Sequence, residues 1–108
     1  KVAYSEMEAV ELQTLLKNGS APIIIDVREE FELEISKIDG AIHIPMNQVP
    51  KRIEELNPEK EYVIMCRTGV RSAQICEFLT NQNFQSIANL SGGINEWAKQ
   101  IDSSLPVY

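Results

Sequence analysis

The fold is decided by residues 62–72, which read Tyr62-Val63-Ile64-Met65-Cys66-Arg67-Thr68-Gly69-Val70-Arg71-Ser72. The apolar run at the start of this stretch predicts a strand that is buried on both faces, as in a parallel sheet. After Cys66 the sequence becomes a short polar loop, and apolar residues at helical spacing follow beyond Arg71. The stretch therefore predicts a strand-to-helix loop at the carboxyl edge of a sheet, where open α/β folds bind ligands.

The same alternation of strands and helices extends to both sides of this stretch. A first helix is expected from about Glu6 to Lys17, because Ser5 and Glu8 form a capping box and Gly19 follows the last apolar turn. The β-branched run at 23–27 predicts a second buried strand. Further segments are expected as a short helix (29–35), an extended piece (41–44), a helix (49–56), a helix from about 71 to 81–83, a strand (86–90) and a helix (94–101). This order predicts a three-layer α/β domain with a mainly parallel sheet.

Length and composition place the chain among ordinary globular domains. Its 108 residues, 44% hydrophobic and 24% charged, predict one domain over residues 1–108 with a radius of gyration of about 13 Å. The sequence begins at Lys1 rather than Met, which leaves two alternatives open: a trimmed chain, or a domain cut from a longer protein. The net charge of −6 disfavours nucleic acid and anionic membranes as partners.

The cysteine and histidine content argues against a metal site and a disulfide framework. Cys66 and Cys76 are the two cysteines and His43 is the one histidine, which is too few ligands for a zinc site. With so few cysteines, no signal-peptide pattern and no apolar run of membrane length, we expect a cytoplasmic protein with reduced thiols. Nothing in the sequence indicates a metal, nucleotide or flavin cofactor.

The setting of Cys66 points to a nucleophile. It lies at the predicted strand end, close to the positive end of the next helix and to free backbone N–H groups, which favour the thiolate and can hold an anion. Gly69 gives the loop the freedom to curl its amides toward the sulfur. Cys76, at helical spacing among apolar residues, is expected to pack in the core, and so is Trp97. His43, with no partners at metal spacing, is expected to be a packed side chain rather than a catalyst.

Four motifs resemble, in order and spacing, the rhodanese-like sulfurtransferase domains: Asp26-Val27-Arg28, Gly40-Ala41 before Pro45, Cys66 to Ser72, and Gly92-Gly93 with Trp97. The resemblance covers nearly the whole chain. It implies a five-stranded parallel sheet between helices, and a cysteine that carries sulfur as a persulfide held by loop amides. On this sequence that cysteine is Cys66.

The resemblance also implies a reaction and roles for the neighbouring residues. Cys66 would attack the outer sulfur of an anionic donor such as thiosulfate, release sulfite and pass the sulfur to a thiophilic acceptor such as cyanide. A cysteine desulfurase is the alternative donor. The expected anion-binding loop comprises Arg67, Thr68, Gly69, Val70, Arg71 and Ser72. Arg67 and Arg71 are expected to attract the donor, the alternative for each being a surface charge or a structural ion pair. Asp26 and Arg28 are expected to give structural support, with Asp26 pairing with the loop or an arginine.

Two rival functions and one partner remain open at this point. A cysteine phosphatase uses a similar loop, but its signature has five residues between Cys and Arg, whereas four separate Cys66 from Arg71. The second rival is a binding or regulatory module that has lost the chemistry. The last residues, 101–108, resemble the carboxyl end of activating enzymes that join an adenylylating domain to a rhodanese-like domain. That likeness implies a small ubiquitin-like sulfur carrier as acceptor.

Overall fold

The structure, a computed structural model, describes residues 4–108. Its centre is a five-stranded sheet in the order β1-β5-β4-β2-β3, in which all four neighbouring pairs are parallel. The strands are β1 (Ser5–Met7), β2 (Ile23–Asp26), β3 (Ile42–His43), β4 (Glu61–Met65) and β5 (Ser86–Leu90). The α/β fold with a five-stranded parallel sheet is therefore confirmed.

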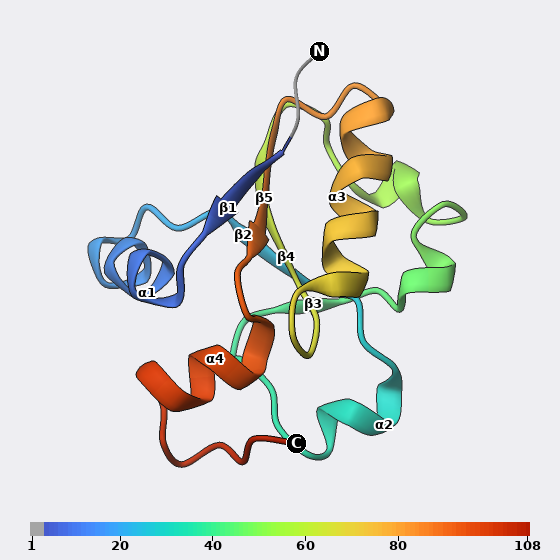
Figure 1. Cartoon of the computed structure of the whole chain (residues 1–108). Coiled ribbons are helices and arrows are strands. Elements are labelled where there is room, and N and C mark those ends of the chain that lie inside the picture. The colour runs from blue at the N-terminus through green and yellow to red at the C-terminus, as the bar shows by residue number, and fades with distance from the viewer. Residues whose placement is uncertain (1–3) are drawn as a thin grey trace.

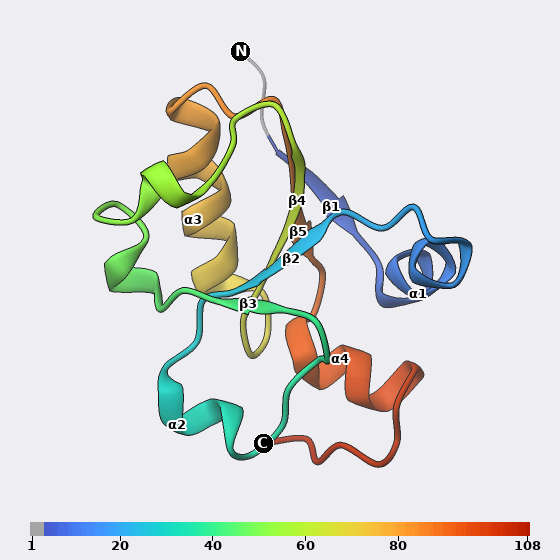
Figure 2. The ribbon, with the colours of Figure 1, turned by 180° about the vertical axis from the view of Figure 1, so that it is seen from behind.

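Helices cover both faces of the sheet (Figures 1 and 2). Helices α1 (Ala9–Asn18) and α4 (Gly93–Gln100) lie on one face, and α3 (Val70–Asn81) lies on the other with the 3-10 helices η1 (Met46–Gln48) and η2 (Ile53–Glu55). The short α2 (Glu30–Leu33) lies beyond the carboxyl edge of the strands, close to the start of α4 and to the last residues of the chain. This edge therefore brings together segments from four parts of the sequence.

Strand β4 contributes side chains to two hydrophobic cores, one on each face of the sheet. Successive side chains of a strand point to opposite faces, so Tyr62 and Ile64 pack with α3 while Val63 and Met65 pack with α1 and α4. All four residues are buried, which explains the continuous apolar run in the sequence. The radius of gyration is 12.8 Å, close to the expected value.

The prediction for residues 5–8 was wrong. Ser5 does not cap a helix, because residues 5–7 form edge strand β1, paired with β5 in the register Ser5 to Ala88 and Met7 to Leu90. Helix α1 begins at Ala9 after Glu8, and ends at Gly19 as expected, with φ of 73°. Pairing with a buried strand outweighed the local capping pattern.

The helix expected over 49–56 was also wrong. The chain there makes two separate 3-10 turns, η1 and η2, rather than one helix. Pro50 lies between them, and because it has no N–H to donate, it interrupts the ladder of hydrogen bonds that a continuous helix would need. In the part of the chain that the structure describes, no helix is long and apolar enough to cross a membrane.

Candidate active site

Cys66 is the first residue after β4, at the carboxyl edge of the sheet, and it is 1% exposed. The chain turns through residues 66–69 and enters α3 at Val70. Gly69 makes this turn possible, because its φ of 102° is disfavoured for residues with a side chain. The predicted strand-to-helix loop is therefore present, and it places the sulfur at the start of a twelve-residue helix.

Three polar groups face the Cys66 sulfur. The backbone N–H groups of Gly69 and Ser72 donate to Sγ at 3.1 and 3.3 Å. The Ser72 hydroxyl lies 3.2 Å from Sγ. Amides at the first turn of a helix carry partial positive charge, so they hold a negatively charged sulfur more strongly than a neutral one.

Helix α4 holds the other side of the loop. Its first turn donates from Ile94 N to Cys66 O at 2.9 Å and from Asn95 N to Arg67 O at 3.1 Å. Gly93 permits this approach, because a Cβ there would lie 2.4 to 2.5 Å from the carbonyl atoms of Arg67 and Cys66. Two carbonyl groups of the loop therefore accept hydrogen bonds from α4, while the amides of Gly69 and Ser72 donate to the sulfur.

A buried amide in β5 connects the loop to the sheet edge. Asn89, 3% exposed, accepts a hydrogen bond from the Ser72 hydroxyl at 2.6 Å and donates to Gly69 O at 3.1 Å. Its Nδ2 also donates to the Glu6 carboxylate of β1 at 3.2 and 3.3 Å. The orientation of Ser72 beside the sulfur is thus fixed by a chain of contacts that reaches the edge strand.

Arg71 forms a bidentate ion pair with Glu32 of α2. Its Nη1 and Nη2 donate to Oε1 and Oε2 at 2.8 and 2.9 Å. The hydrogen bonds from Arg71 lower the pKa of the Glu32 carboxyl to about 2; burial opposes this shift, and a hydrogen bond from the Tyr108 hydroxyl adds to it. The Arg71 side chain stays one-third exposed, so it remains at the mouth of the site although its charge is compensated.

Asp26 and Arg28 form a buried ion pair below the site. The Arg28 side chain is fully buried and donates to both carboxylate oxygens of Asp26 at 2.8 to 3.2 Å. It also donates to the carbonyl oxygens of Glu32 and Ser36. Asp26 pairs with this arginine rather than with the loop, and Arg28 ties the α2 segment to the end of β2.

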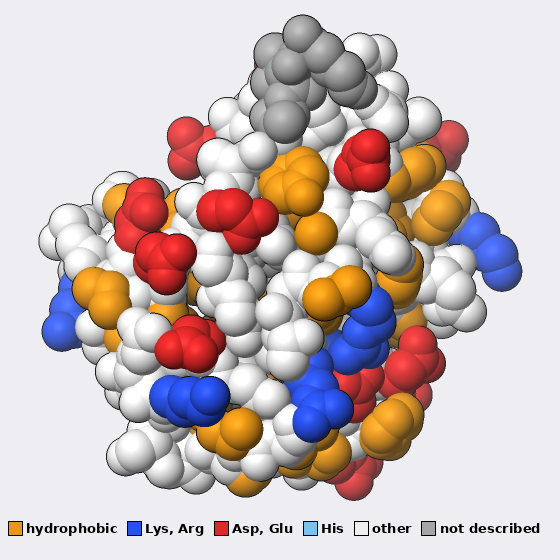
Figure 3. Space-filling model, in the orientation of Figure 1, with side chains coloured by type: hydrophobic (Ala, Val, Ile, Leu, Met, Phe, Trp, Pro, Cys, Tyr) orange, Lys and Arg blue, Asp and Glu red, His pale blue; other side chains and the backbone are white. Residues whose placement is uncertain are grey.

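Arg67 and Tyr108 form a cation–π pair at the opening. The Arg67 guanidinium carbon lies 4.8 Å from the centre of the Tyr108 ring. Thr68 and Val70 are exposed, with Val70 65% exposed. The space-filling view shows Lys and Arg side chains gathered near the loop before α3, with acidic side chains beside them (Figure 3).

Cys76 and Trp97 lie in the core as the sequence suggested, and His43 is half-buried. Cys76 is fully buried in the core, and burial strongly raises the pKa of its thiol. Trp97 is buried, and His43 makes a hydrogen bond through Nε2 with Arg28 O at 2.7 Å. Neither cysteine is in a disulfide.

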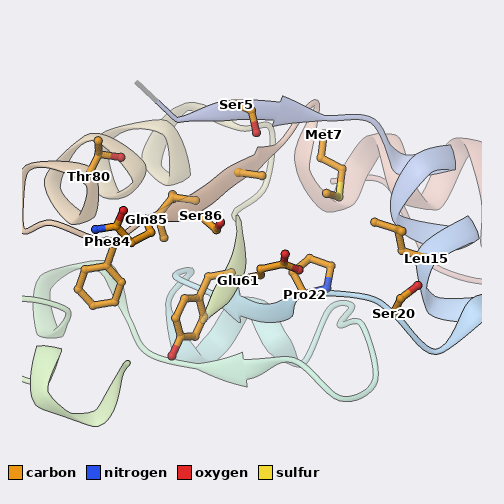
Figure 4. A pocket seen from close by; sticks show the side chains of 13 residues that line it. Ser5, Met7, Leu15, Ser20, Pro22, Glu61, Thr80, Phe84, Gln85 and Ser86 are labelled. Atoms are coloured by element: carbon orange, nitrogen blue, oxygen red, sulfur yellow. The ribbon is translucent and has the colours of Figure 1, made fainter. Parts of the chain in front are cut away.

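A pocket of about 670 Å³ lies at the opposite end of the sheet from Cys66. It is lined by β1, by the amino ends of β4 and β5 and by residues such as Leu15, Pro22 and Phe84 (Figure 4). No residue of the 66–72 loop lines it. This pocket is therefore separate from the loop around Cys66.

The structure brings Cys66, Gly69 and Ser72 together but turns the arginines to partners that sequence reasoning did not identify. The missed residues are Glu6, Glu32, Asn89, Asn95 and Tyr108. Asn89 had a signal, because it is the polar residue inside the apolar end of a strand. The contacts of Glu32 and Tyr108 span 39 and 76 residues, and no local pattern marks them.

Comparison with known proteins identifies the class. The family model for the rhodanese-like domain matches residues 8–100. A sulfurtransferase of Allochromatium vinosum is 33% identical over 95 residues, which cover 88% of this chain and 89% of that protein. The crystal structure of a rhodanese-related protein from Thermoplasma volcanium matches with a TM-score of 0.81 and 33% identity, covering 97% of this chain and 98% of that one.

A longer relative carries the same domain. The adenylyltransferase and sulfurtransferase uba4 of Ogataea parapolymorpha is 30% identical over 112 residues, covering all of this chain and 28% of that protein. The chain belongs to the rhodanese-like domain family. The names of its relatives support sulfur transfer as the general class of activity.

Proposed function

We propose that the protein is a sulfurtransferase that carries sulfane sulfur as a persulfide on Cys66. The observation that carries this proposal is the set of polar groups that face Sγ: the Gly69 and Ser72 amides, which donate to it at 3.1 and 3.3 Å, and the Ser72 hydroxyl, which lies 3.2 Å away. A cysteine with these donors at a helix start is suited to hold negative charge on sulfur.

The reaction with thiosulfate has two steps. The Cys66 thiolate attacks the outer sulfur, a new S–S bond forms to Sγ, and the bond to the sulfite group breaks with its electron pair, which releases sulfite. Cyanide then attacks the terminal sulfur, thiocyanate leaves and the thiolate is restored. Because Cys66 is 1% exposed, the terminal sulfur is the atom that an acceptor reaches.

The loop supplies the charge that an anionic donor needs. The whole chain has a net charge of −6, so a local cation has to offset the repulsion. Arg67 supplies it, because its guanidinium faces a ring rather than a carboxylate. Arg71 adds less, since Glu32 compensates its charge, and we assign it chiefly to shaping the mouth.

Intact mass spectrometry of the purified protein tests the proposal. After thiosulfate the wild type should gain one sulfur atom, and cyanide should remove it. Cys66→Ala should gain none, whereas Cys76→Ala, which removes a buried thiol, should behave as wild type. No sulfur on the wild type from thiosulfate or from a cysteine desulfurase would contradict the proposal and favour a binding module.

A phosphatase reaction is disfavoured by Arg71. In such a loop the arginine has to bind the phosphate oxygens, but here both of its Nη atoms are bound to Glu32. Four residues separate it from Cys66, so the loop also closes on a smaller group. Hydrolysis of an aryl phosphate that disappears in Cys66→Ser would overturn this assignment.

For the physiological acceptor we propose a small ubiquitin-like sulfur carrier with an adenylylated carboxyl end. The support is the match to a protein named adenylyltransferase and sulfurtransferase, of which this chain covers 28%. We also propose a cytoplasmic location, because the reaction needs a reduced Cys66 at each turnover and the cytoplasm keeps thiols reduced. Sulfur transfer from the labelled persulfide to such a carrier, followed by mass, tests the acceptor.

A further inference from the structure

Tyr108 contacts the Arg67 guanidinium directly, and it also contacts the carboxylate that binds Arg71. Its ring lies 4.8 Å from the guanidinium carbon of Arg67. Its hydroxyl donates to Oε2 of Glu32 at 2.6 Å, and the same carboxylate binds Arg71. One side chain therefore touches Arg67 directly and reaches Arg71 through a single carboxylate.

The position of Tyr108 is fixed at three points. Its backbone N–H donates to Asn95 Oδ1 at 3.2 Å, and Asn95 Nδ2 donates to its carbonyl at 2.8 Å. The buried Arg28 donates from Nη1 to the phenol oxygen at 2.9 Å. Asn95 also donates from its own backbone to Arg67 O, so one residue of α4 holds both the loop and the tyrosine.

Local hydrogen bonds and core packing position the segment that leads to Tyr108. After α4 the chain turns at Asp102, whose carboxylate accepts from the N–H and hydroxyl of Ser104, and Leu105 N donates back to Asp102 O. Leu105 and Tyr108 pack against the core on the α1 and α4 side of the sheet. Figures 1 and 2 show the segment returning to the chain that follows α2.

We propose that Tyr108 is a positioning residue that sets the placement of Arg67 and Arg71 for an anionic sulfur donor, which rests on the proposed sulfurtransferase function. Among residues 4–108, Arg67 forms no ion pair, so the ring face is what restrains this flexible and exposed cation. A ring face attracts a cation without neutralising it, so its charge stays available to a donor. A carboxylate in the same place would cancel it.

Two substitutions at Tyr108 separate the ring from the hydroxyl. Tyr108→Phe keeps the ring beside Arg67 and removes the hydroxyl contacts with Glu32 and Arg28, whereas Tyr108→Leu removes the ring as well. With thiosulfate as donor and dithiothreitol as a neutral acceptor, which reduces the persulfide to sulfide and becomes a disulfide, the KM for thiosulfate should rise about twofold in the first variant and roughly fivefold in the second. The KM for dithiothreitol should not change.

A second readout does not depend on sulfur transfer. The rate at which the Cys66 thiol reacts with anionic iodoacetate, divided by the rate with neutral iodoacetamide, reports the local positive charge. This ratio should fall about threefold in Tyr108→Leu, and it should also fall in Asn95→Ala. In Tyr108→Phe, which keeps the ring, the ratio should stay near the wild-type value. Val107→Ala, a change at a half-exposed neighbour in the same segment, serves as the matched control and should leave the ratio unchanged.

The outcomes distinguish this proposal from the function on which it rests. A wild type that takes up no sulfur contradicts the proposed function, while the alkylation ratio still measures the effect of Tyr108. A Tyr108→Leu protein that melts cooperatively and keeps the wild-type ratio and KM overturns the positioning role. Equal slowing with both alkylating reagents also overturns it, because loss of structure, unlike loss of a positioned cation, acts on neutral and anionic reagents alike.

Discussion

The Arg71 guanidinium and the Glu32 carboxylate lie in a bidentate pair, with both N to O distances at 2.8 to 2.9 Å, although 39 residues separate them. Glu32 is nearly buried and Arg71 is one-third exposed. The pair joins α2 to the first turn of α3, next to the reactive loop. The stability of that junction should therefore depend on the charge of one carboxylate.

Stability should fall as Glu32 takes up a proton. Its pKa is about 2 in the folded protein, below its ordinary 4.5, so the pair contributes fully above about pH 5 and loses its contribution as pH falls toward 2. The shift corresponds to up to about 3 kcal/mol, reduced by solvent around Arg71. Chemical unfolding of wild type and Glu32→Gln at pH 7, 5 and 3.5 measures this, and the difference between them should shrink on acidification. A difference that stays constant with pH would show that the charge contributes nothing.

Removing Arg28 should destabilise the protein strongly. Arg28→Met keeps most of the side-chain volume but leaves the buried Asp26 carboxylate unpaired, which costs about 3–5 kcal/mol. Urea unfolding measures the loss. The matched control is Arg52→Met, because Arg52 also binds a carboxylate, that of Glu55, with two hydrogen bonds but does so at the surface. The control should show little change; similar losses in both variants would contradict the role of burial.

Two glycines with left-handed backbones should respond differently to alanine. Gly93→Ala places a Cβ within 2.5 Å of the Arg67 and Cys66 carbonyls, so the loop or α4 has to move, with a loss of more than about 2 kcal/mol and of sulfur uptake. Gly40→Ala meets no atom within 4 Å and bears only the backbone strain, about 1 kcal/mol. Thermal unfolding and sulfur uptake of both variants compare them. Normal uptake by Gly93→Ala would show that the close approach of α4 is not needed.

The parts of the site that could be predicted are those contained in one continuous stretch. Strand, turn and helix follow one another from Tyr62 onward, so the position of Cys66 at the sheet edge follows from local patterns. Strand β1 has three residues and exists only because β5 offers a partner, so the local capping pattern at Ser5 gave the wrong element.

The arginines show the limit of prediction from sequence. Two cations in a loop indicate an anion site. Whether each cation is free to bind an anion depends on which side chain the fold places next to it. The fold brings Glu32 to Arg71 and Tyr108 to Arg67, from segments that share no local pattern with the loop. The alternative of a structural ion pair, left open for Arg71 on sequence grounds, is present in the structure.

Ser72 should contribute to sulfur uptake through its single hydroxyl hydrogen. The hydroxyl lies 3.2 Å from Sγ and 2.6 Å from Asn89 Oδ1, and it can donate to only one of them at a time. When Cys66 carries negative charge, donation to the sulfur is favoured, so Ser72→Ala should lower kcat/KM for thiosulfate about tenfold while the two amides keep some activity.

Steady-state kinetics with thiosulfate measures this effect, with Ser91→Ala as the control. Ser91 donates to Glu6 at 2.7 Å, so it belongs to the same chain of hydrogen bonds. Asn89 and Glu6 lie between it and Ser72 in that chain. Its loss should leave kcat/KM near the wild-type value. If Ser72→Ala also kept the wild-type value, the hydroxyl would remain on Asn89 throughout the reaction, and the amides of Gly69 and Ser72 alone would hold the charged sulfur.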